Sequence, residues 1–205
     1  MTRKNHSQEH YYTVQPNSDV KLGLIQTSLR GDPFEFMTAS SVFSKKRVDT
    51  GTRLLIESMA LPSSGKILDL GCGYGPVGIA AAHFNPCLQV VLTDVNMRAV
   101  RLARDNVERN KVANAEVRCG FLYESVEALT FNCVLSNPPV SAGMVTVKAI
   151  ITEAPKIMAM KATLQMVIRS KIGGKTLPAV FESVFGNCQV LAREGGYRVL
   201  IAEKH

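Results

Sequence analysis

Apolar and polar residues alternate along positions 20–38, and the alternation breaks once, at Arg30-Gly31-Asp32-Pro33. A period of two is typical of a half-buried strand, and Gly and Pro between two such runs indicate a turn. The segment is therefore predicted to form a β-hairpin. A helix is expected over 49–59, where apolar positions recur before Pro62 stops the pattern.

A break at Ser63-Ser64-Gly65 separates these elements from a different pattern. We expect an N-terminal extension of hairpin and helix at 1–60, packed on a core domain at 61–205. From residue 65 onward, short apolar runs alternate with longer helical runs. The predicted strands are 66–70, 90–94, 115–119, 132–136, 163–168, 188–193 and 197–203. The predicted helices are 76–84, 96–110, 147–160 and 177–185.

Strands that alternate with helices pair in parallel. The last two predicted strands are separated only by Glu194-Gly195-Gly196, which is too short for a crossover helix and suits a hairpin. The expected fold class is α/β: a doubly wound, mostly parallel seven-stranded sheet with an antiparallel C-terminal edge hairpin. Ligands of such sheets bind beyond the carboxyl ends of the strands. This rule brings 69–75, Asp94 and 136–139 to one crevice.

The segment from Asp69 to Gly78 (DLGCGYGPVG) follows a predicted strand and opens a predicted helix. Its glycines allow a tight turn and a close approach of ligand to backbone, and they satisfy GxGxxG. Asp69 would repel the pyrophosphate of a dinucleotide but suits a ligand that carries cationic groups, such as S-adenosylmethionine. Asp94 is placed to accept hydrogen bonds from ribose hydroxyls. The binding candidates here are Asp69, Gly71, Cys72, Gly73, Gly75 and Asp94.

Asn137-Pro138-Pro139 follows the fourth predicted strand of the core. Two consecutive prolines stiffen the backbone and leave carbonyl groups without competing donors. The side-chain oxygen of Asn137 and the carbonyl of Pro138 could each accept one hydrogen of an amine. An amine held in this way would present its lone pair to an activated methyl group, so catalysis would consist mainly of positioning. The three residues are the catalytic candidates.

Charge adds a preference for a polyanionic partner. The net charge is +7 and the sequence pI is near 9.3, so nucleic acid would be attracted with a salt-dependent affinity. We expect a basic surface to flank the crevice, and a solvated positive face is the alternative. Its candidate members are Lys45, Lys46, Arg47, Lys148, Lys156, Lys161, Arg169, Lys171 and Lys175.

The five cysteines are odd in number and never spaced as CxxC, which favours free thiols in a reducing compartment over disulfides or zinc. No metal is expected. The first ten residues lack an apolar h-region, and no run approaches about 20 apolar residues. We therefore expect a cytoplasmic protein without a membrane partner.

DLGCGYG followed by LTDVN resembles the cofactor-binding motifs of class I S-adenosylmethionine-dependent methyltransferases, which have a Rossmann-like fold. Residues 42–45, residues 48–52 and SNPP-x-x-AG are similar to the small-domain relatives of ribosomal RNA small subunit methyltransferase C. The resemblance implies S-adenosylmethionine as cofactor, N2-methylguanine as product, and ribosomal RNA or a ribosomal particle as partner. It adds Phe43, Thr52, Val95, Asn96, Phe121 and Asn137 to the cofactor-binding candidates.

The same resemblance places Asp49 beside Phe43 and Thr52, in a segment over the cofactor. A core aromatic, an acid at a helix start and a cap are the structural alternatives for these three residues. The chain departs from its relatives at Gly120-Phe121-Leu122, where many have an acidic residue that holds the adenine amino group.

Other functions stay open at this stage. A protein-glutamine N5 methyltransferase shares the Asn-Pro-Pro motif but takes a protein substrate. An NAD-binding oxidoreductase would also use a glycine-rich turn. A non-catalytic RNA-binding protein would be basic and indifferent to S-adenosylmethionine. Both a monomer and a homodimer are compatible with the sequence.

Overall fold

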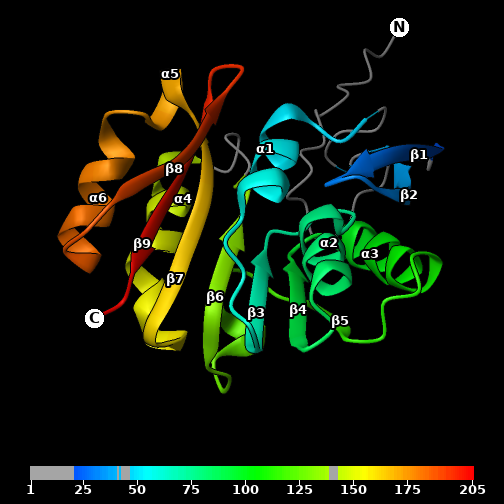
Figure 1. Cartoon of the computed structure of the whole chain (residues 1–205), viewed down its shortest axis with the longest axis horizontal. Helices are drawn as coiled ribbons and strands as arrows, with labels where there is room; N and C mark the ends of the chain where they lie inside the picture. Colours follow the sequence, from blue (N-terminus) through cyan, green and yellow to red (C-terminus); the bar gives the residue numbers. More distant parts are fainter. Residues whose placement is uncertain (1–20, 41, 43–46, 139–142) are drawn as a thin grey trace, which may run out of the picture.

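The computed structural model describes residues 21–205 except 41, 43–46 and 139–142. Within these residues the chain forms a two-stranded sheet and a seven-stranded sheet (Figure 1). The large sheet has the order β5-β4-β3-β6-β7-β9-β8. Its strands are β3 (Gly65–Leu70), β4 (Leu88–Asp94), β5 (Ala115–Cys119), β6 (Phe131–Ser136), β7 (Met158–Arg169), β8 (Gln189–Glu194) and β9 (Tyr197–Glu203).

Five strands of the large sheet, β3 to β7, pair in parallel, and β9 pairs antiparallel with both β7 and β8. The sheet order reverses between β3 and β6, which creates the switch point at which ligands of such sheets bind. The predicted fold class is thus confirmed. The C-terminal hairpin lies at the edge with β9 as its inner strand.

Helices cover both faces of this sheet. α1 (Thr50–Ser58), α2 (Pro76–Phe84) and α3 (Met97–Arg109) lie on one face, and α4 (Gly143–Glu153) and α6 (Thr176–Phe185) lie on the other (Figure 1). The buried apolar residues form two clusters, one on each face of the sheet. Neighbouring residues of β3 point to opposite faces: Ile67 packs into the cluster under α1, α2 and α3, and Leu68 into the cluster under α4 and α6. The remaining helical elements are α5 (Ser170–Gly173), η1 (Glu124–Val126) and η3 (Ala154–Ile157).

The N-terminal hairpin consists of β1 (Leu22–Leu29) and β2 (Asp32–Ala39), as the alternation predicts. Arg30 and Gly31 have φ of 48° and 92°, the left-handed pair that a tight hairpin turn requires. The Arg30 guanidinium donates to the carbonyl oxygens of Ile56 at 2.7 Å and Met59 at 2.6 Å. These bonds fasten the turn to the end of α1.

Side chains of α3 hold the other strand of the hairpin. Asn106, which is fully buried, donates through Nδ2 to the carbonyl oxygens of Met37 and Tyr74, both at 2.9 Å, and accepts from Met37 N at 2.7 Å. Asn110 makes a similar pair of bonds with the backbone of Glu35. Within the described residues, side-chain hydrogen bonds from arginine and asparagine and apolar packing join the hairpin to the core, without a shared strand ladder.

One predicted helix was wrong in its extent. The run at 147–160 was expected to be helical throughout, whereas α4 spans 143–153, η3 follows at 154–157, and β7 begins at Met158. Pro155 explains the change, because it has no N–H for the helical ladder and disfavours helical geometry at the residue before it. The apolar residues 158–160 then form the start of the strand.

Candidate functional site

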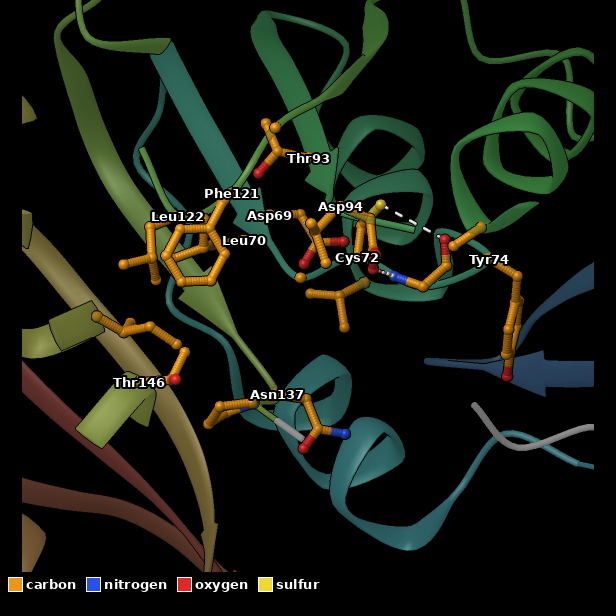
Figure 2. Close-up of a pocket in the computed structure, with 18 of the residues that line it drawn as sticks. Asp69, Leu70, Cys72, Tyr74, Thr93, Asp94, Phe121, Leu122, Asn137 and Thr146 are labelled. Atoms are coloured by element: carbon orange, nitrogen blue, oxygen red, sulfur yellow. Dashed lines mark hydrogen bonds between the residues drawn. The ribbon is translucent and has the colours of Figure 1, made fainter. Parts of the chain in front are cut away.

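A cavity opens at the carboxyl ends of β3, β4 and β6, the edge of the sheet to which the sequence assigns its motifs (Figure 2). Asp69, Asp94 and Cys72 lie together in its middle, Phe121 and Leu122 on one side, and Asn137 near α1. The residues that line it come from at least six segments. They are Val42, Thr52, Asp69–Tyr74, Pro76, Val77, Thr93–Val95, Ala99, Gly120–Leu122, Asn137, Pro138, Thr146, Val147 and Ile150.

Most of the predicted site residues meet at this cavity: Thr52, Asp69, Gly71, Cys72, Gly73, Asp94, Val95, Phe121, Asn137 and Pro138. Gly75 and Asn96 do not line it. Asn96 is fully buried as the N-cap of α3 and accepts from Arg98 N at 2.9 Å. Gly75 has φ of 94°, and a Cβ there would lie 2.9 Å from Ile79. Phe43 and Pro139 lie outside the described residues.

The glycine-rich turn presents bare backbone to the cavity. Gly71 and Gly73 have φ of 73° and 59°, and a Cβ added at either position would meet no heavy atom within 4 Å. The N–H groups of Gly71 and Cys72 donate to Thr93 O at 2.8 and 2.9 Å, which ties the turn to β4. The turn thus holds a fixed shape and leaves open space next to its backbone.

Two carboxylates face this turn from neighbouring strands. Asp69 accepts a hydrogen bond from Gly78 N at 2.7 Å, and burial raises its pKa to about 7, with a further contribution from Asp94. Asp94 accepts from Gly73 N at 2.9 Å and from Asn96 N at 2.8 Å, and burial also raises its pKa. Uncompensated negative charge is costly here, so the site suits a cationic group.

The raised pKa of Asp69 predicts a pH dependence of stability. Between the ordinary value of 3.8 and about 7, the folded chain keeps a proton that the unfolded chain has lost. The free energy of unfolding should therefore fall as pH rises through this interval. Urea unfolding at pH 5 and pH 7.5 measures the difference. Asp69→Asn, which can still accept from Gly78, should reduce it.

Asp105→Asn is the control, because Asp105 is an exposed carboxylate on α3. This variant should keep the wild-type difference between the two pH values. An Asp69→Asn protein with an undiminished difference would contradict the assignment.

Asn137 is held at the end of β6 by contacts on both sides. Ser136 Oγ donates to Leu70 O at 2.9 Å and fixes the end of β6 against β3. Asn137 Nδ2 donates to Thr52 Oγ1 at 2.8 Å. Within the described part of the chain, no residue donates a hydrogen bond to Asn137 Oδ1. The cavity therefore has an oriented acceptor to which none of the described residues donates.

Sequence reasoning missed several residues of the cavity. Thr146, Val147 and Ile150 come from α4, whose first turn the predicted helix omitted. Thr93 is fully buried, and its hydroxyl has no hydrogen-bond partner among the described residues. Its position directly before Asp94 was the available signal.

The basic candidates divide between two edges of the sheet. Ser136 pairs with Met166, so the carboxyl end of β7 lies at the cavity edge of the sheet. Arg169 is the last residue of β7, Lys171 and Lys175 follow it, and all three are exposed. Lys156 and Lys161 lie at the start of β7, the opposite edge, and the expectation that they flank the crevice was wrong. Lys148 is exposed on α4, and Arg47 is exposed before α1. Lys45 and Lys46 lie outside the described residues.

Three further features of the described residues concern membrane spans, metal sites and disulfides. None of the helices is long and apolar enough to cross a membrane. In the same part of the chain, no group of three or more His, Cys, Asp or Glu side chains could hold a metal ion. All five cysteines are free thiols.

Comparison with known proteins places this geometry among methyltransferases. The profile of the methyltransferase small domain family matches residues 33–201. The Bacillus subtilis protein YbxB, which is uncharacterised, is 37% identical over 198 residues, which are 96% of this chain and 98% of that protein. Ribosomal RNA small subunit methyltransferase C of Haemophilus influenzae is 32% identical over 93% of this chain and 58% of its own length.

Among solved structures, the fold matches the T. thermophilus 16S rRNA N2 G1207 methyltransferase in complex with AdoMet and guanosine, with a TM-score of 0.80 and 22% identity. The match covers 93% of this chain and 52% of that protein. The chain thus spans about half the length of the ribosomal RNA methyltransferases that it matches, and nearly the whole of the Bacillus protein.

Proposed function

The chain belongs to the methyltransferase small domain family, and we propose that it methylates the exocyclic N2 amine of a guanine in ribosomal RNA. As a member it is an S-adenosylmethionine-dependent methyltransferase, and the family resemblance read from the sequence is confirmed. Relatives named as ribosomal RNA small subunit methyltransferase C support the substrate class, since they are 30–32% identical to this chain.

The cavity has the chemistry that this cofactor requires. Bound S-adenosylmethionine supplies a methyl group on a positively charged sulfur, which becomes a neutral thioether after transfer. Asp69 and Asp94 provide negative charge for cationic groups in the cavity, and Gly71 and Gly73 leave room beside the backbone. The hydroxyl of Thr93, which has no hydrogen-bond partner among the described residues, offers an additional polar group.

The observation that carries the proposal is the Asn137 Oδ1 acceptor, which faces the cavity without a donor among the described residues. Its Oδ1 accepts one hydrogen of the substrate amine, and the carbonyl of Pro138 is proposed to accept the other. Held in this way, the amine would present its lone pair to the methyl group that the bound cofactor supplies, so that transfer would form an N–C bond as the C–S bond breaks. The surplus proton on nitrogen passes to water. Positioning of this kind accounts for most of the catalysis.

Charge at the cavity edge supports RNA over protein as the substrate. Arg169 at the end of β7 and Lys171 and Lys175 directly after it are exposed, next to the strand end that carries Asn137. Lys171 and Lys175 would contact phosphates and add a salt-dependent contribution to affinity. We further propose that the protein works in the cytoplasm, and that residues 1–60 form an extension of the domain at 61–205.

The test is transfer of a labelled methyl group in parallel reactions with ribosomal RNA, small ribosomal particles and release factor proteins. We expect label in RNA, recovered as N2-methylguanosine after nuclease digestion. Label in release factor glutamine would contradict the proposal and favour a protein-glutamine methyltransferase. Calorimetry should detect binding of S-adenosylmethionine and none of NAD, and the reverse result would favour an oxidoreductase.

A further inference from the structure

Three polar side chains from two distant parts of the sequence form a hydrogen-bonded chain at the wall of the cavity, which Thr52 and Asn137 line. Asp49 is the N-cap of α1, and its Oδ1 accepts from Gly51 N at 2.9 Å and Thr52 N at 3.3 Å. Thr52 Oγ1 donates to the other oxygen of Asp49. Asn137 Nδ2 donates to Thr52 Oγ1 at 2.8 Å and lies 3.4 Å from Asp49 Oδ2.

The number of available hydrogens fixes the direction of every bond in this chain. The Asp49 carboxylate has acceptors only, and a threonine hydroxyl has one hydrogen. That hydrogen goes to Asp49, so Thr52 Oγ1 can only accept from Asn137. The NH₂ group of Asn137 must therefore face α1. Its Oδ1 is left for the substrate, with no described residue as donor.

We propose that Asp49 and Thr52 are positioning residues that hold the Asn137 amide in one orientation and thereby select a substrate that donates an N–H at the point of attack. This proposal rests on the proposed function and explains how the site would select an amine as its substrate. A flipped amide would present NH₂ to the substrate amine, donor against donor. A base with a carbonyl in place of the amine would bring oxygen against Oδ1, and hypoxanthine offers no donor there.

Asp49 performs two tasks with its two oxygens. One oxygen caps α1, and the other orders the Thr52 hydroxyl. Substitution by alanine would remove both, and loss of an N-cap alone destabilises a helix by roughly 1 kcal/mol. Asparagine is an equally good N-cap, so Asp49→Asn preserves the helix. It replaces the acceptor that faces the Thr52 hydroxyl by a group that can donate a hydrogen bond.

The expected effect of Asp49→Asn follows from the number of hydrogens that each side chain can donate. The side-chain amide that this substitution introduces can donate its own NH₂ to Thr52, which turns the Thr52 hydroxyl into a donor toward residue 137. The favoured partner of that donor is the Asn137 oxygen, so the Asn137 amide rotates. We expect kcat to fall at least tenfold, while the dissociation constant for S-adenosylmethionine stays within about threefold.

Thr52 is tested by three variants. Thr52→Val removes the hydroxyl at nearly constant volume and should lower kcat about tenfold or more, and Thr52→Ser should restore it to within about threefold of wild type. Thr50→Val is the matched control on the same helix turn, because Thr50 is exposed and makes no contact with the chain of bonds. It should keep wild-type kcat.

A second readout is independent of turnover. In ¹⁵N spectra the Asn137 side-chain NH₂ should exchange slowly with solvent in wild type and Thr52→Ser, and should shift and exchange faster in Thr52→Val. Wild-type kcat in both Thr52→Val and Asp49→Asn, or an unchanged Asn137 signal in Thr52→Val, would overturn the inference. Wild-type protein that methylates no RNA would instead overturn the proposed function.

Discussion

Asn137→Ala is expected to lower kcat for methyl transfer at least about 100-fold and to leave the dissociation constant for S-adenosylmethionine within about threefold. The alanine removes the acceptor that orients the amine, and a loss of alignment at the reacting atoms costs rate far more than affinity. Pro138 and the Ser136 bond to Leu70 keep the backbone in place, so the cofactor cavity should survive. Single-turnover transfer of labelled methyl and calorimetry measure the two quantities.

Asn132→Ala is the control for this prediction, because Asn132 is exposed near the other end of β6 and bonds to Lys66 N. It should transfer methyl at the wild-type rate. If Asn137→Ala kept more than about one-tenth of wild-type kcat, the amide would not be the group that orients the amine.

Asn106→Ala is expected to produce the largest loss of stability, about 3 kcal/mol in the free energy of unfolding. The Asn106 amide, which is itself fully buried, satisfies Met37 N, Met37 O and Tyr74 O; the bond to Tyr74 O is buried and the two bonds to Met37 are partly buried. Alanine would leave all three groups without these partners at a buried or partly buried position, and each buried group left unpaired costs roughly 1–3 kcal/mol before the structure relaxes. Urea unfolding followed by circular dichroism measures the loss.

Asn110→Ala provides the comparison, since Asn110 bonds to Glu35 from the next turn of α3 but is only partly buried. Water can replace the hydrogen bonds of Asn110, so Asn110→Ala should lower the free energy of unfolding by less than half as much as Asn106→Ala. Equal losses in the two variants would show that burial of the Asn106 site is not the cause.

The sequence predicted most elements of the fold because their signals are local. The strand at 115–119, the helix at 76–84 and the hairpin turn at Arg30-Gly31 each depend on neighbouring residues alone. The prediction of where α4 ends was wrong because the local signal there is ambiguous. An apolar run at 157–160 suits a helix and a buried strand equally, and only Pro155 distinguishes them.

The part of the candidate site that lies at the ends of strands could be predicted from the sequence. Asp69, Asp94 and Asn137 share one edge because parallel strands bring their carboxyl ends together. The partner of Asn137 was not predictable, since Thr52 lies 85 residues away in the sequence and belongs to a helix outside the sheet. Asn96 was assigned to the ligand by its motif, whereas its side chain caps α3. Side-chain pairing across the fold requires the three-dimensional arrangement.

The position of β9 between β7 and β8 also affects how the protein matures. During synthesis β7 leaves the ribosome about 30 residues before the strand that must pair with its open side. The half of the sheet from β3 to β6 can form while translation continues, but the other half must wait for residues 197–203. Until then the apolar edge of β7 stays unpaired, which makes this interval the step at which a nascent chain would aggregate or engage a chaperone.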